Sequence, residues 1–199
     1  MSNQGVYQLI LYVVKTQPTA MIKITSEFKI ALQKNNYSSF YDDSRQLWSI
    51  LFESEEVVAS FATQITLCKC NLMQNNIENA NLYQELKVNN ENDAIFIESG
   101  DSIEIETLVT VVKETKLADI IENTQQKSFK LKLGKNKIPK RIEDLIINMK
   151  QGERRLFVLT GSMLAPFFTN LIATNSIVFY DINILKVRFT HIYLILNKN

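Results

Sequence analysis

Histidine and cysteine are scarce in this chain of 199 residues, which contains one His and two Cys. No serine or cysteine motif of the known kinds accompanies His191, so a catalytic triad is not expected. Cys68 and Cys70 form a C-x-C pair without further Cys or His nearby, which is a poor match to the spacing of zinc ligands. So few cysteines also favour a reducing compartment. The sequence therefore predicts neither a metal site nor a cofactor.

Long apolar runs and a strong net charge are also missing. No run reaches the roughly 20 apolar residues that span a bilayer, and the N-terminus lacks the pattern of a signal peptide. The net charge of +1 creates no field that would favour nucleic acid or an acidic membrane. With 46% hydrophobic and 22% charged residues, the chain can build a core. We expect a cytoplasmic protein of one or two domains that binds no nucleic acid and has no transmembrane segment.

The first half of the sequence predicts several short strands followed by one helix. Runs rich in β-branched and aromatic residues, bounded by turn formers, indicate strands at residues 6–14, 21–24, 28–32, 37–41 and 48–52. Ser54 stands at an N-cap position with Glu55 and Glu56 in the first turn, where the helix dipole favours them. An apolar stripe with helical spacing follows, and its members are Val58, Phe61, Ile65, Cys68 and Leu72.

The second half contains a strand, a tight turn, a short helix and another strand within residues 129–159. Phe129, Leu131 and Leu133 alternate with lysines, which is the period of a half-buried strand. Gly134 begins a turn, and Pro139 suits the first turn of a helix. An apolar helical face follows, formed by Ile142, Leu145, Ile146 and Met149. Further strands are expected at residues 103–109 and 177–187, and residues 111–126 are ambiguous between helix and strand.

This stretch also holds a specific series of residues: Leu133-Gly134-Lys135, Ile138-Pro139-Lys140, Glu143, Asp144, Met149, Lys150, Gly152 and Arg154. The series resembles the central segment of the FKBP-type peptidyl-prolyl isomerase domain. The likeness extends from Gly100-Asp101-Ser102, similar to that domain's glycine turn, to residues 177–187, similar to its last strand. It covers about half of the chain.

Residues 37–54, YSSFYDDSRQLWSILFES, resemble the later strands of a WH1 (EVH1) domain, a pleckstrin-homology-like barrel closed by a C-terminal helix. Both halves in this order resemble the WASP- and FKBP-like family. The expected fold is α+β: a truncated PH-like (WH1) β-barrel with a C-terminal helix, then an FKBP-like curved antiparallel sheet with one short helix. We expect the WH1-like part at residues 1–74, a linker at 75–93 in which 82–88 can form a strand, the FKBP-type domain at 94–189 and a tail at 190–199.

The resemblance implies a shallow apolar cup that holds proline. Prolyl isomerisation needs no nucleophile, because a catalyst need only bind the twisted amide better than the planar one. The resemblance places in this cup Phe129, Ile138, Ile142, Tyr180 and Thr107, with Asp119 as its polar group. WH1 domains grip proline-rich peptides with aromatic side chains, and Phe52 matches one of those aromatics. The alternative interpretation of Phe52, and of Trp48, is that each fills a core.

Several cup residues depart from the family pattern. Ile142 stands where the family usually has tryptophan, Thr107 replaces a tyrosine, and Val109 and Arg141 replace glycines. Residues 161–170 bring no tyrosine over the cup, and the chain has only 5 glycines. We therefore expect an adaptor that binds proline-containing peptides or proteins with weak or absent isomerase activity. The resemblance implies actin-regulatory partners and early-endosome traffic, and an active peptidyl-prolyl isomerase is the alternative.

Overall fold

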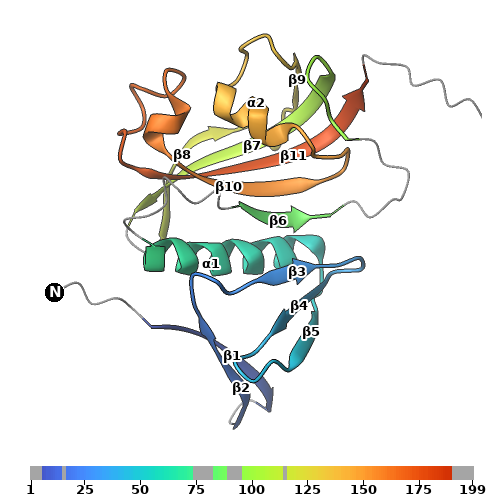
Figure 1. Ribbon diagram of the computed structural model, residues 1–199, viewed down its shortest axis with the longest axis vertical. Coiled ribbons are helices and arrows are strands. Elements are labelled where there is room, and N and C mark those ends of the chain that lie inside the picture. The colour runs from blue at the N-terminus through green and yellow to red at the C-terminus, as the bar shows by residue number, and fades with distance from the viewer. Residues whose placement is uncertain (1–5, 15–16, 74–82, 89–95, 114–115, 190–199) are drawn as a thin grey trace, which may run out of the picture.

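The computed structural model describes residues 6–14, 17–73, 83–88, 96–113 and 116–189. Figure 1 shows two stacked halves with the long helix α1 between them. Above α1 lies a curved antiparallel sheet that carries the short helix α2 on its other face, and below α1 lie two smaller sheets. This mixed architecture of antiparallel sheets and few helices confirms the expected fold class. Among the described residues no sheet closes into a barrel, and the PH-like character of the first half stays a prediction.

The first half consists of two small antiparallel sheets and α1. Strands β1 and β2 form one sheet, and β3, β4 and β5 form the other in that order. Their bounds are β1 Tyr7–Val14, β2 Gln17–Ile24, β3 Ile30–Leu32, β4 Tyr37–Tyr41, β5 Leu47–Leu51 and α1 Glu55–Met73. The Ser54 hydroxyl accepts a hydrogen bond from the Val57 amide at 3.4 Å. The expected N-cap therefore begins the helix where the sequence placed it.

The second half is one large antiparallel sheet. Its strands lie in the order β6-β10-β11-β7-β8, and β9 pairs with β7 beyond the end of β8. The bounds are β6 Tyr83–Lys87, β7 Ser102–Lys113, β8 Lys116–Asn123, β9 Phe129–Lys132, α2 Lys140–Ile146, β10 Arg154–Thr160, the 3₁₀ helix η2 Gly161–Leu164 and β11 Ile177–Arg188. The strand expected at residues 82–88 is β6, so part of the predicted linker belongs to this sheet. The tail at 190–199 lies outside the described residues.

Strand β10 shows that the large sheet is covered on both faces. Phe157 and Leu159 belong to the core on the α2 side, whereas Leu156 and Val158 belong to the core on the α1 side. Side chains alternate between the two faces of a strand, and all four of these are buried. The core on the α1 side is therefore shared by both halves: from α1 it includes Val58, Ala62 and Ile65, and from the sheet Leu86, Val112 and Phe179.

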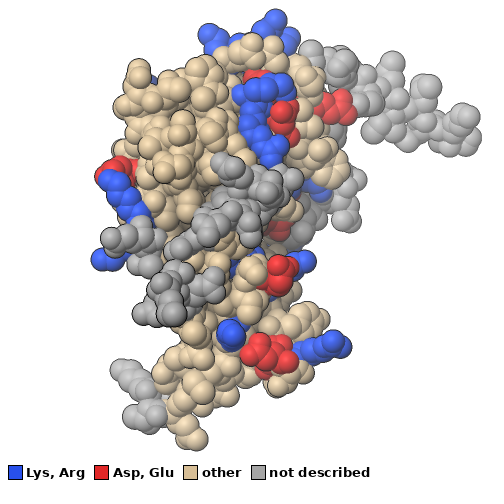
Figure 2. All heavy atoms as spheres, turned by 60° about the vertical axis from the view of Figure 1, so that its left-hand side comes forward, with Lys and Arg blue, Asp and Glu red and all other residues tan. Residues whose placement is uncertain are grey.

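Charged side chains do not gather by sign on the face drawn in Figure 2. Basic and acidic side chains occur there in small groups, and most of the described surface in view is neither. This distribution agrees with a net charge of +1. A strong electrostatic field over this face is therefore not expected.

The shared core predicts that the two halves unfold together. Ile65→Ala removes a buried side chain (4% exposed) from α1 and is expected to lower the free energy of unfolding by about 2–5 kcal/mol. Urea unfolding should give one transition. Trp48 fluorescence monitors it in the first half, and amide hydrogen exchange of β7 and β11 monitors it in the second. The exposed neighbour Gln64→Ala should have little effect. Loss of the Trp48 signal well before loss of β7 protection would contradict the shared core.

The loop that follows β10 predicts a steric effect at Gly161. The Gly161 amide donates to the Ser176 carbonyl at 2.9 Å, and a Cβ on Gly161 would lie 2.1 Å from the Ala173 carbonyl oxygen. Gly161→Ala is therefore expected to destabilise the protein by about 1–3 kcal/mol, as overpacking does, measured as a lower urea midpoint. Asn170→Ala, at an exposed position in the same loop, is the matched control. Equal stability of both variants would show that the loop yields without strain.

Candidate functional site

The turn before α2 fixes the position of that helix. Gly134 adopts a φ of +81°, which glycine reaches without steric strain. Its amide donates to the Glu143 Oε1 atom at 3.3 Å, and Glu143 is buried. Pro139 immediately precedes α2, where a missing N–H leaves no helical hydrogen bond unmade. This local geometry directs Ile142 into the core beneath α2.

Most predicted cup residues lie together on the α2 side of the sheet. Ile138, Ile142 and Tyr180 belong to one buried cluster, and the half-buried Phe129 packs against it. Ile142 and Tyr180 are 0% and 1% exposed. The structure therefore gathers these four apolar residues, but their arrangement is a filled core with Phe129 at its margin.

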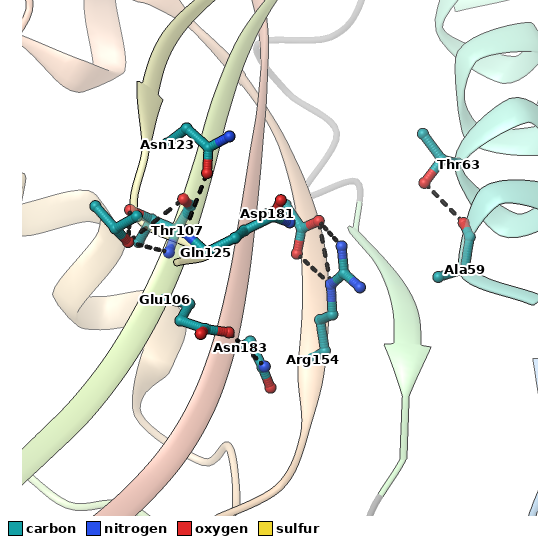
Figure 3. Close-up of polar contacts among 10 residues, drawn as sticks. Ala59, Thr63, Glu106, Thr107, Asn123, Gln125, Arg154, Asp181 and Asn183 are labelled. Carbon is teal, nitrogen blue, oxygen red and sulfur yellow. Dashed lines mark hydrogen bonds and ion pairs between the residues drawn. The ribbon is translucent and has the colours of Figure 1, made fainter. Parts of the chain in front are cut away.

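Thr107 lies on the same face of β7 and is held by hydrogen bonds to β8 and the residue after it. Its hydroxyl donates to the Glu122 Oε1 atom and lies 3.1 Å from the Thr124 hydroxyl. The Thr107 amide donates to the Thr124 hydroxyl at 2.7 Å, and some of these contacts are drawn in Figure 3. Glu122 is paired with Val109 in the register of β7 and β8. A carboxylate therefore stands beside Thr107, but it belongs to Glu122.

The charge of this carboxylate acts on Tyr180, which lies within the cluster. Burial raises the pKa of the Tyr180 hydroxyl, and the nearby charge of Glu122 raises it further. Tyr180 is therefore neutral at physiological pH. The ring of Phe168, from the loop after η2, meets the Tyr180 ring edge-on with centroids 6.5 Å apart. Phe168 and Met163 are partly buried against the same cluster, so η2 and the loop after it cover the cup with apolar side chains.

Asp119 lies away from this group. It is exposed and forms an ion pair with Lys113, whereas Glu122 is the acidic side chain near the predicted cup. The sequence carried little signal for Glu122, because register shifts between β7 and β8 interrupt the alternation of β8. The resemblance alone could not fix which acidic residue of this segment faces the sheet.

Phe52 and Trp48 both pack against the α1-side core. The Phe52 ring lies 5.1 Å from that of Phe61 on α1, centroid to centroid. The Trp48 indole nitrogen donates to the Asp42 Oδ2 atom at 2.9 Å. Phe52 therefore contacts the helix of its own half, and its predicted role in binding polyproline stays a prediction.

The two cysteines of α1 differ in environment. Cys70 is fully buried, and burial raises the pKa of its thiol to about 12, whereas Cys68 is partly exposed. Within the described residues, no three His, Cys, Asp or Glu side chains come together as a metal site would require. In the same part of the chain, no helix has both the length and the apolar character to cross a bilayer.

Comparison with known proteins agrees with this geometry. The family described as FKBP-type peptidyl-prolyl cis-trans isomerase matches residues 94–185. FK506-binding protein 15 from Mus musculus and from Homo sapiens are 35% and 34% identical to this chain over 92% of its length. The chain spans 15% of the length of each of these relatives.

Two further proteins are more distant. FK506-binding protein 5 from Dictyostelium discoideum is 23% identical over 81% of this chain and 10% of its own length. The solved N-terminal domain of FKBP42 from Arabidopsis thaliana covers 54% of this chain and 85% of its own, with 16% identity and a TM-score of 0.43. Residues 94–185 of this chain thus form a domain of the FKBP-type peptidyl-prolyl cis-trans isomerase family, and the homologues that align with 92% of the chain are named FK506-binding protein 15.

Proposed function

We propose that this FKBP-type domain binds proline-containing segments of other proteins and has weak or absent isomerase activity. The observation that supports this most is the filled floor of the cup. Val109 and Ile142 are 0% exposed and Thr107 is 1% exposed. These are three of the positions at which the sequence departs from the family pattern. A proline ring can therefore rest only on the margin, at Phe129, Phe168 and their neighbours.

The missing aromatic surface accounts for low turnover. The barrier to rotation about the prolyl bond is about 18–20 kcal/mol, and a catalyst lowers it by binding the twisted amide more tightly than the planar one. Losing one large, well-packed aromatic costs about 3–5 kcal/mol of contact energy. Were that loss to fall on the transition state, the rate would drop by roughly two to four decades. Binding of the ground state needs less of this surface and can persist.

The acidic side chain of the cup supports the same conclusion. The resemblance to the FKBP-type family implies a polar group at the rim of the cup, where it can contact the bound peptide. Here the Glu122 carboxylate accepts the Thr107 hydroxyl. Glu122 is thus engaged within the fold. Turnover by the alternative route, an active isomerase, would have to rely on the remaining aromatics, Phe129, Phe168 and Tyr180.

In this proposal the protein is a cytoplasmic adaptor linked to actin-regulatory partners and to early-endosome traffic. The support is the resemblance to the WASP- and FKBP-like family, together with 34–35% identity to FK506-binding protein 15. A WH1-like first half could add a second proline-binding surface. Phe52 would contribute only with the part of its ring that α1 leaves uncovered.

A protease-coupled assay on an Ala-Pro peptide tests the activity. At about micromolar protein, the cis-to-trans relaxation should stay near the uncatalysed tens to hundreds of seconds, because the cup offers little aromatic surface to the twisted amide. An active FKBP-type isomerase serves as the positive control. A clear acceleration would establish the alternative, an active isomerase, and reject the adaptor with little turnover.

Phe168 and Phe167 form a matched pair for testing proline binding. Phe168 packs on Tyr180, whereas Phe167 is 44% exposed. Phe168→Ala should weaken binding of the same Ala-Pro peptide by about tenfold, or about 1.4 kcal/mol, as measured by NMR titration. Phe167→Ala should leave it nearly unchanged. Equal effects of the two changes, or no binding by the unaltered chain together with no binding of the macrolide FK506, would refute the proposed site.

A further inference from the structure

A groove separates one face of α1 from the outer face of the large sheet, opposite the cup. It has a volume of about 400 Å³. Ligand sites typically enclose about 300–1,000 Å³ and often lie where two structural units meet. The α1-side core, which includes Ala62, Ile65 and Val158, fills the neighbouring region between α1 and the sheet. The groove opens beside that contact, over β7 and β11.

The helical wall of the groove is polar and regularly spaced. Glu56, Ser60 and Thr63 stand at positions i, i+4 and i+7 of α1, which lie on one helical face, and Gln64 adjoins them. From Glu56 to Gln64 the helix rises by about 12 Å. An extended peptide advances by about 3.3 Å per residue, so roughly four residues would fit alongside.

The groove offers hydrogen-bonding groups above an apolar floor. The Thr63 hydroxyl turns back to the Ala59 carbonyl at 2.8 Å, as Figure 3 shows. The side chains of Ser60, Gln64 and Gln125 make no hydrogen bond to another residue in the described part of the chain, and all three residues are exposed. Beneath them the sheet contributes Leu108, Leu156 and Phe179. This combination suits a peptide, which brings both backbone amides and apolar side chains.

The charges at the groove are unbalanced toward the acidic side. Arg154 forms a two-pronged ion pair with the buried Asp181, with Nε–Oδ1 at 2.9 Å and Nη2–Oδ2 at 2.6 Å (Figure 3). The Asp181 carboxylate balances the positive charge of Arg154, and the hydrogen bond to Asp181 raises the pKa of Arg154. Glu106 lines an adjoining hollow of about 80 Å³, and its Oε2 atom accepts a hydrogen bond from the neutral Asn183 amide at 3.1 Å (Figure 3). Among the charged residues that line the groove, Glu56 and Asp181 outnumber Arg154, so the lining has an excess of negative charge, and Glu106 in the adjoining hollow adds to it.

We propose that this groove binds an extended peptide segment of a partner protein, about four residues long, with a basic side chain next to an apolar one. The basic group lies beside Glu56 at the helical wall of the groove, where opposite charges attract. The apolar side chain rests on the partly exposed Leu108 and the exposed Leu117, and the exposed amides of Gln64 and Gln125 bond to the peptide backbone. The site is separate from the cup, because the two lie on opposite faces of the sheet.

A pair of fluorescein-labelled hexapeptides tests the charge preference on the 199-residue chain. The first is Ala-Leu-Arg-Leu-Ala-Ala, and the second carries Glu in place of Arg. Fluorescence anisotropy should show saturable binding of the first peptide and at least about tenfold weaker binding of the second, because like charges repel. An unlabelled Ala-Pro peptide in excess should not displace the first. Absence of saturation up to about 1 mM, equal binding of both peptides or displacement by the proline peptide would overturn the proposal.

Two tryptophan substitutions on α1 locate the site. Ser60→Trp places a large ring in the groove and should weaken binding of the arginine peptide by about tenfold or more. Val57→Trp is the matched control: Val57 is 41% exposed and does not line the groove, so affinity should change by less than about twofold. Unchanged binding by Ser60→Trp would refute the site. If the unaltered chain forms a dimer and Ser60→Trp dissociates it, the groove binds a second copy of the chain. That result would also overturn the proposal that it binds a peptide.

Discussion

The packing of α1 on the outer face of the large sheet is the contact on which the rest of this structure depends. It covers Leu156, Val158 and Phe179, which a sheet with only α2 would leave in water. Fully burying a side chain of this kind stabilises a fold by about 1.5–3 kcal/mol. The same helix covers the two small sheets below it. One helix therefore supplies the apolar surface that both halves need.

This arrangement also explains where polar groups are buried. Near the edge of the α1 contact, β10 and β11 present Arg154 and Asp181 on the outer face. Burial raises the pKa of the Asp181 carboxyl, and the pairing with Arg154 opposes that rise. Removing either partner would leave a buried charge without compensation, which is far less favourable than the intact pair. The ion pair thus marks the line at which apolar packing ends and the groove begins.

Much of the local structure could be predicted from the sequence. Ser54 begins α1 and Pro139 precedes α2, because both residues act on the first turn of the helix that follows them. The run from Leu156 to Leu159 is apolar without alternation, and such runs are typical of strands buried on both faces. This run is predicted above only as a strand, and nothing local identifies α1 as the layer that covers its outer face.

Contacts between segments distant in sequence could not be predicted in the same way. The register shifts between β7 and β8 decide which acidic side chain faces Thr107, and they placed Glu122 there. The groove depends on how far α1 stands from β7, which is a property of the whole packing. The resemblance to the FKBP-type family concerns the α2 side of the sheet and gives no information about the α1 side, where the groove lies.

The hydrogen bond between Trp48 and Asp42 has a consequence for optical experiments on this protein. The chain has a single tryptophan, and its indole donates to a carboxylate that also accepts the Ser44 and Gln46 amides at 2.9 Å each. These bonds lower the pKa of Asp42, with the bond from Trp48 as the largest cause. The carboxylate therefore stays ionised into mildly acidic solution, and the surroundings of the indole stay constant there. A shift of the tryptophan emission maximum in that pH range therefore reports a conformational change of the chain, and Trp48 serves as an intrinsic fluorescent probe.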